Sequence, residues 1–119
     1  IVLVDDSIVR GTTSKQLVHL IKEAKPKSVH LRISSPPIMH PCFYGMDFPS
    51  SEELIAYQKN GNIEEIKKYL EVDSLEYLTI NEMLEAVSEA GKDNFCTACF
   101  SGNYPTKITT NFKKEMYEV

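Results

Sequence analysis

The chain has 119 residues, of which 42% are hydrophobic and 25% are charged, and its formal net charge is −4. This charge argues against a nucleic-acid partner, because Lys and Arg are not concentrated into a basic stripe. No apolar run is long enough to span a membrane and no signal peptide is visible, so we expect a soluble, cytoplasmic protein without a membrane partner.

The N-terminal part of the chain predicts a strand, a loop and a helix. Residues 1–4 are apolar throughout, which is typical of a parallel strand that is buried on both faces. The next periodic stretch places Leu17, Leu20 and Ile21 on one side of a helix. Ligands of open α/β sheets bind outside the carboxyl ends of the strands, which is where the connecting loop would lie.

The loop DDSIVRGTTS has the residue types of a sugar-phosphate site. Gly11 allows a close approach of the backbone, and the N–H groups of residues 12–14 would lie at the positive end of a helix, which suits a phosphate. Asp5 and Asp6 are acceptors for vicinal ribose hydroxyls or for a hydrated Mg²⁺ ion. Alternatively, Ser7 and the Thr/Ser run only cap a helix, and the aspartates form a solvated turn.

A second strand follows at residues 27–34, where apolar and polar residues alternate. It would close a right-handed β-α-β unit with the first strand, and the Ser-Pro-Pro sequence at residues 35–37 would end it. The inward positions are Val29, Leu31 and Ile33, and the outward positions are His30 and Arg32.

Three capping signals predict helices in the second half of the chain. Each pairs an N-cap residue with a Glu three positions later, and the N-cap residues are Ser50, Asn62 and Thr79. The first two helices would be divided at residues 60–61, and residues 74–78 predict a short strand. Towards the C-terminus the pattern becomes irregular.

The loop and several later segments are similar to one known family. The stretch IVLVDDSIVRGTTS resembles the phosphoribosyl pyrophosphate (PRPP) motif of type I phosphoribosyltransferases, and in particular that of the amidophosphoribosyltransferases. Further segments resemble the same family in the same order, namely SPP at 35–37, HPCFYGMD at 40–47, ELIA at 53–56 and CTACFSGNYP at 96–105. Two alternatives stay open, namely another type I phosphoribosyltransferase and a PRPP-binding regulatory domain without catalysis.

The resemblance implies an α/β fold that is a fragment of a type I phosphoribosyltransferase, a parallel sheet with flanking helices. Residues 1–49 would form the PRPP-loop half of that domain, and residues 50–119 a C-terminal helical and irregular extension. The chain begins within a strand and has no initiator Met, so we expect a fragment that lacks the N-terminal glutaminase domain of the family. The whole enzyme would convert PRPP and glutamine to 5-phosphoribosylamine, pyrophosphate and glutamate in the first step of de novo purine biosynthesis, and the fragment would be inactive alone.

The resemblance also implies the roles of individual loop residues. Asp5 and Asp6 would be the catalytic residues and would hold Mg²⁺. Purine nucleotides would inhibit by occupying the same phosphate loop, and the whole enzyme would be a homotetramer. The residues implied to bind PRPP or a nucleotide phosphate are Asp5, Asp6, Ser7, Arg10, Gly11, Thr12, Thr13 and Ser14.

The three cysteines are Cys42, Cys96 and Cys99, of which the last two form a single C-x-x-C. A lone C-x-x-C is compatible with a redox dithiol, a zinc half-site or two unrelated thiols, and Cys42 alone with a small buried hydrophobe. The family resemblance implies that all three are ligands of a 4Fe-4S cluster whose fourth ligand lies outside this chain, and we expect the cluster to be labile in the fragment. We interpret His40 as an ordinary loop residue rather than as a ligand.

Overall fold

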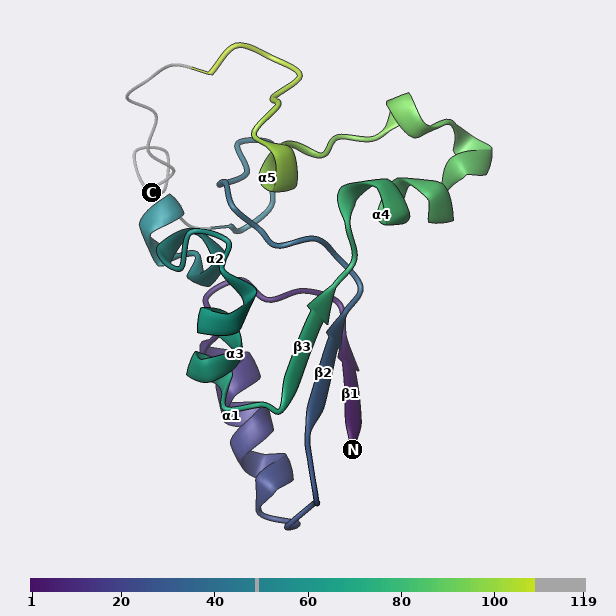
Figure 1. Cartoon of the computed structure of the whole chain (residues 1–119). Helices are drawn as coiled ribbons and strands as arrows, with labels where there is room; N and C mark the ends of the chain where they lie inside the picture. The colour runs from purple at the N-terminus through teal and green to yellow at the C-terminus, as the bar shows by residue number, and fades with distance from the viewer. Residues whose placement is uncertain (49, 109–119) are drawn as a thin grey trace.

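The computed structural model describes residues 1–48 and 50–108, apart from the side chains of Ala90 and Lys92. Short 3-10 segments lie at Ser51–Glu53, Ser88–Ala90 and Lys92–Asn94. The strands and α-helices, labelled in Figure 1, are β1 (Val2–Asp5), α1 (Thr12–Lys22), β2 (His30–Ile33), α2 (Ile55–Gln58), α3 (Ile63–Leu70), β3 (Ser74–Tyr77), α4 (Ile80–Ala86) and α5 (Ala98–Ser101).

The three strands form one parallel sheet in the order β1-β2-β3. The chain passes from β1 to β2 through α1 and from β2 to β3 through α2 and α3. The helices α1 and α3 lie on the same face of the sheet (Figure 1). This is the arrangement that right-handed crossovers produce when successive strands are added in one direction. The predicted α/β class and the strands predicted at residues 27–34 and 74–78 are therefore confirmed.

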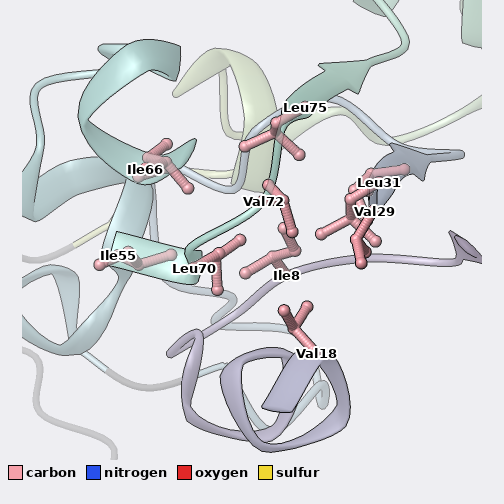
Figure 2. Close-up of a cluster of buried hydrophobic side chains, with 11 residues drawn as sticks. Ile8, Val18, Val29, Leu31, Ile55, Ile66, Leu70, Val72 and Leu75 are labelled. Carbon is pink, nitrogen blue, oxygen red and sulfur yellow. The ribbon is translucent and has the colours of Figure 1, made fainter. Parts of the chain in front are cut away.

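A single hydrophobic core lies between the sheet and its helices (Figure 2). Ile8, which belongs to the loop after β1, is 1% exposed and lies within this core, so the loop is fixed from its inner side. Residues on both sides of the predicted boundary between residues 49 and 50 contribute to this core. The buried residues of the hydrophobic core are Ile8, Val18, Val29, Leu31, Ile33, Ile55, Ala56, Ile66, Leu70, Val72 and Leu75.

The prediction that the first strand is buried on both faces is wrong. Val2 and Val4 are 63% and 68% exposed, because the core helices all pack on the opposite face of the sheet. On the open face, Arg32 forms an ion pair with Glu76 of the neighbouring strand, with Nε and Oε2 3.3 Å apart. The apolar residues of this strand are therefore buried on only one of its two faces.

Of the residues that the sequence placed on one side of the first helix, Ile21 packs against the core but Leu20 does not. Leu20 is 62% exposed, whereas Val18 and Ser14 are buried. The helix begins at Thr12, and its buried face follows Ser14 and Val18, which are four positions apart.

Two of the three predicted helix caps are confirmed. The side chain of Asn62 accepts a hydrogen bond from the backbone of Glu65, and Thr79 forms a complete capping box with Glu82. Ser50 precedes only a 3-10 turn, and α2 begins after Leu54, which is fully buried. Within the part of the chain that the structure describes, no helix has the length and apolar character needed to cross a membrane.

Candidate functional site

A pocket of about 390 Å³ lies where the carboxyl end of β1 meets the N-terminus of α1. This position matches the general rule for ligand sites in open α/β sheets. The structure brings together every residue that the sequence assigned to PRPP binding, and it adds Val9 and Asp47. The pocket is lined by Asp5, Asp6, Ser7, Val9, Arg10, Gly11, Thr12, Thr13, Ser14 and Asp47.

Gly11 gives this pocket its open helix terminus. It is the N-cap of α1 with φ of 84°, a left-handed conformation that side-chain-bearing residues rarely adopt. A Cβ added here would lie 3.1 Å from Cε1 of Tyr69, so a larger residue would also force Tyr69 to shift by a few tenths of an ångström. No side chain caps the helix, which counts against the alternative that the Ser and Thr residues are only caps. The first N–H groups of α1 therefore present the positive end of the helix dipole to the pocket.

The two aspartates are held by short-range hydrogen bonds within the loop. The backbone N–H of Asp6 donates to Oδ1 of Asp5 at 2.9 Å, and the Ser7 hydroxyl donates to Oδ1 of Asp6 at 3.0 Å. The carbonyl of Asp5 accepts from the N–H of Ser34 at 3.0 Å, which ties the loop to the end of β2. The carboxylates thus stand at the sheet end of the pocket, and the helix N-terminus lines the same pocket.

Arg10 lines the pocket but is also engaged at its rim. Its Nε lies 3.8 Å from Oε1 of Glu53, and both side chains are about half exposed. Such a surface pair contributes little to stability. The stronger link between these segments is the backbone hydrogen bond from Ile55 N–H to the carbonyl of Val9, at 3.0 Å.

Asp47 is the pocket residue that sequence reasoning missed. It lies in the segment HPCFYGMD, which contributed to the family resemblance, but no local pattern placed it near the loop. Only the fold shows that it supplies a third carboxylate to the pocket. Acceptors and an anion-binding helix terminus in one pocket can bind a phosphorylated sugar at both its hydroxyl and its phosphate groups.

A second cavity, of about 350 Å³, is lined by all three cysteines. We call it the thiol cavity. None of the three forms a disulfide. Burial raises the pKa of the Cys99 thiol to about 11, and the neighbouring thiols of Cys42 and Cys96 add to the rise. The other lining residues are Tyr44, Met46, Phe48, Ala98 and Pro105.

The three cysteines share a cavity but are not grouped as the ligands of a single metal ion. Among residues 1–48 and 50–108, no group of three or more His, Cys, Asp or Glu side chains is arranged to hold one ion. His40 is not a lining residue, and it lies instead against Gly102, where an added Cβ would be 2.9 Å from Nε2 of His40.

Comparison with known proteins agrees with this geometry. No family model matches the chain. The chain is 51% identical to the amidophosphoribosyltransferase of Synechococcus elongatus over 96% of its own length and 22% of that protein. It is 47% identical to the enzyme of the same name from Bacillus subtilis, over 91% of this chain and 23% of the relative. The chain is homologous to a segment of the amidophosphoribosyltransferases.

The solved structures of this family share the fold. The glutamine PRPP amidotransferase from B. subtilis, solved in complex with ADP and GMP, superposes with a TM-score of 0.82 at 46% identity, covering 92% of this chain and 24% of that chain. The resemblance to amidophosphoribosyltransferases and the parallel-sheet fold predicted from the sequence are both confirmed. The chain spans less than a quarter of the length of these relatives.

A larger cavity, of about 740 Å³, lies away from the residues that resemble the amidophosphoribosyltransferase loop. It lies between residues 36–39, the end of β3 and the start of α4. Tyr77 lines it, and the buried hydroxyl of this residue has no hydrogen-bond partner among the described residues. Burial raises the pKa of Tyr77 to about 12. The described lining of this cavity contains no Lys, Arg or His, and at the start of α4 Thr79 and Glu82 already cap the helix.

Proposed function

We propose that this chain is the PRPP-binding part of an amidophosphoribosyltransferase. The whole enzyme converts PRPP and glutamine to 5-phosphoribosylamine, pyrophosphate and glutamate, the first step of de novo purine biosynthesis. One observation carries the proposal, namely that Asp5, Asp6 and the open N-terminus of α1 line a single pocket. The sequence identity of about 50% to amidophosphoribosyltransferases supports the proposal.

In this proposal the two ends of the pocket have separate tasks. The 5-phosphate accepts hydrogen bonds from the N–H groups at the start of α1, and the ribose hydroxyls donate to Asp5 and Asp6. Ammonia then attacks the anomeric carbon as its bond to pyrophosphate breaks, and the nitrogen loses a proton. Positive charge develops on the ribose ring as pyrophosphate leaves, and the nearby carboxylates stabilise this charge. The ammonia derives from glutamine that is hydrolysed outside this chain.

Asp5 and Asp6 are also the proposed Mg²⁺ ligands. Mg²⁺ in phosphate-transfer sites is usually bound by one or two carboxylates together with substrate phosphates and water, so two aspartates suffice from the protein. When bound, the ion would neutralise the charge of the leaving pyrophosphate.

We propose that Cys42, Cys96 and Cys99 hold a 4Fe-4S cluster, with a fourth ligand from outside this chain. Their shared cavity and free thiols support this. When bound, the cluster would cross-link two segments that are far apart in the sequence. Anaerobic reconstitution with iron and sulfide tests the proposal, and we expect a broad visible absorbance that is lost in Cys96→Ser and unchanged in a Ser88→Ala control.

We also propose how the whole enzyme is regulated, how it assembles and where it is located. Purine nucleotides would inhibit by binding to the phosphate pocket, which agrees with the ADP and GMP complex of the similar B. subtilis structure. We propose a homotetramer for the whole enzyme and a cytoplasmic location, where free thiols persist. Some plant relatives are named as chloroplastic.

Isothermal titration calorimetry with PRPP and Mg²⁺, followed by an assay with ammonia, tests the function of the chain. We expect saturable binding without turnover. Competition by inorganic phosphate or GMP would agree with the proposed pocket. Absence of binding by a chain that circular dichroism shows to be folded would contradict the proposal, and rapid product formation would contradict its inactivity as a fragment.

A further inference from the structure

One short segment lies between the phosphate pocket and the thiol cavity. We call residues 42–48 the bridging segment. Its alternate residues line the thiol cavity, whereas Asp47 lines the phosphate pocket. Residues 43–45 form a bend in which Gly45 has φ of 115°, and this one segment contributes side chains to both cavities. The residues on the thiol side are Cys42, Tyr44, Met46 and Phe48.

The start of the bridging segment is attached to the part of the chain that carries the C-x-x-C. The N–H groups of Met39 and His40 both donate to the carbonyl of Cys99, at 3.0 and 3.1 Å. The Tyr104 hydroxyl donates to the carbonyl of Pro41 at 2.7 Å. These contacts fix the chain immediately before Cys42.

Two further contacts hold the bridging segment on the same side. The Tyr44 hydroxyl lies 2.8 Å from the hydroxyl of Thr106, and the rings of Phe43 and Tyr104 are 5.2 Å apart. The segment therefore packs along the C-terminal stretch over several residues.

Beyond the bridging segment, the chain is attached to the phosphate loop. The N–H of Ile55 donates to the carbonyl of Val9, which is itself a lining residue of the phosphate pocket. Asp47 thus lies between an attachment to the cysteine-bearing stretch and an attachment to the loop. Because consecutive Cα atoms are only about 3.8 Å apart, a backbone shift at Met46 or Phe48 would be passed on to Asp47.

We propose that Asp47 is a third carboxylate of the phosphate pocket that accepts hydrogen bonds from the hydroxyls of the sugar phosphate, and that the packing of the thiol cavity positions it. The inference rests on the proposed function, which assigned hydroxyl recognition to Asp5 and Asp6 alone. It adds a recognition residue and connects the state of the three thiols to sugar-phosphate affinity. Asp47 acts here in binding, and the residues of the thiol cavity act as positioning residues.

The first test compares Asp47→Asn with Asp93→Asn, an exposed aspartate that lines neither cavity. Calorimetry measures binding of ribose 5-phosphate without Mg²⁺ and of PRPP with Mg²⁺. We expect Asp47→Asn to weaken both by about tenfold, the usual effect of losing one charge-assisted hydrogen bond, and Asp93→Asn to change neither. Unchanged affinity in Asp47→Asn overturns the inference, and an effect confined to the Mg²⁺ arm overturns hydroxyl recognition. Absence of binding by the unsubstituted chain overturns the proposed function and, with it, this inference.

The second test asks whether the thiol cavity acts through Asp47. The unsubstituted chain and Asp47→Asn are alkylated with N-ethylmaleimide, with adducts at each cysteine counted by mass spectrometry. Cys42→Phe, alone and combined with Asp47→Asn, fills the same cavity without a reagent. We expect filling the cavity to weaken ribose 5-phosphate binding about fivefold when Asp47 is present and less than about twofold when residue 47 is Asn. The effects of the two changes on binding free energy would add only if the cavity and Asp47 acted independently. Equal losses in both backgrounds, with unchanged circular dichroism, would overturn the positioning role.

Discussion

The candidate binding groups of the phosphate pocket are mostly neighbours in the sequence, in residues 5–14, whereas the thiol cavity combines residues 42–48 with residues 96–105. The phosphate loop is held by Ile8, which lies in the core, and by the backbone hydrogen bond from Ser34, directly after β2, to Asp5. The thiol cavity is held by hydrogen bonds and ring contacts between partly exposed side chains. The first region therefore depends on the core of the fold and the second on contacts between two peripheral segments, so they should respond to different perturbations.

Ile8→Ala should have the largest effect on stability. It removes a fully buried side chain from the core beneath the phosphate loop and should lower the free energy of unfolding by about 3 kcal/mol. Leu20→Ala, which truncates an exposed side chain, should change it by less than about 0.5 kcal/mol. Urea denaturation followed by circular dichroism measures both. Equal losses would mean that the loop is not supported by the core.

Gly11→Ala should abolish most sugar-phosphate binding. The alanine would combine an unfavourable φ of 84° with a Cβ contact at 3.1 Å to Tyr69, so the loop or the Tyr69 side chain must shift. We expect about a hundredfold loss of PRPP affinity in calorimetry, equivalent to about 2.7 kcal/mol. Gly61→Ala is the matched control, because Gly61 also has positive φ but an added Cβ would meet only Met39 at 3.8 Å, outside the phosphate pocket. That variant should lose about 1 kcal/mol of stability and keep its affinity within about twofold.

Alkaline pH should destabilise the folded chain partly through the thiol region. The pKa of Cys99 is raised to about 11 in the folded chain, so between about pH 9 and pH 11 the unfolded chain binds fewer protons and the free energy of unfolding falls as pH rises. Cys99→Ala should remove part of this decline, whereas Cys96→Ala, at an exposed position of the same C-x-x-C, should retain it. Urea midpoints measured across this pH range distinguish the two. Identical pH profiles in both variants would contradict the assigned burial of Cys99.

The smallest expected effects come from two tyrosine hydroxyls. Tyr77→Phe removes a buried hydroxyl without a partner among the described residues and should be neutral or stabilising by up to about 1 kcal/mol. Tyr104→Phe removes the hydrogen bond to Pro41 beside the thiol cavity and should cost about 1 kcal/mol. Thermal unfolding should therefore show a lower midpoint for Tyr104→Phe and an unchanged or higher midpoint for Tyr77→Phe. A loss in Tyr77→Phe would indicate that its hydroxyl has a partner.

The sequence predicted those features that depend on neighbours along the chain. The caps at Asn62 and Thr79 each use a residue three positions away, and the alternation in β2 follows directly from strand geometry. The same holds for the phosphate loop, where Gly11 and the following residues are contiguous. Such features need little knowledge of what packs against them.

Features that depend on how distant segments of the chain pack together were predicted poorly. The exposure of Val4 and Leu20 depends on which faces other elements cover, and an apolar residue type does not report this. Asp47 joins the phosphate pocket only because the chain between the thiol cavity and α2 passes beside the loop. The cysteines were grouped through family resemblance, since spacing alone left several interpretations open.

A crystal structure of the chain with bound ribose 5-phosphate is the most direct test of the central claim. We expect the phosphate within hydrogen-bond distance of the N–H groups of Thr12 to Ser14, and the sugar hydroxyls facing Asp5 and Asp6. Density for the ligand in the cavity beside Tyr77, with the pocket at Gly11 empty, would contradict the account.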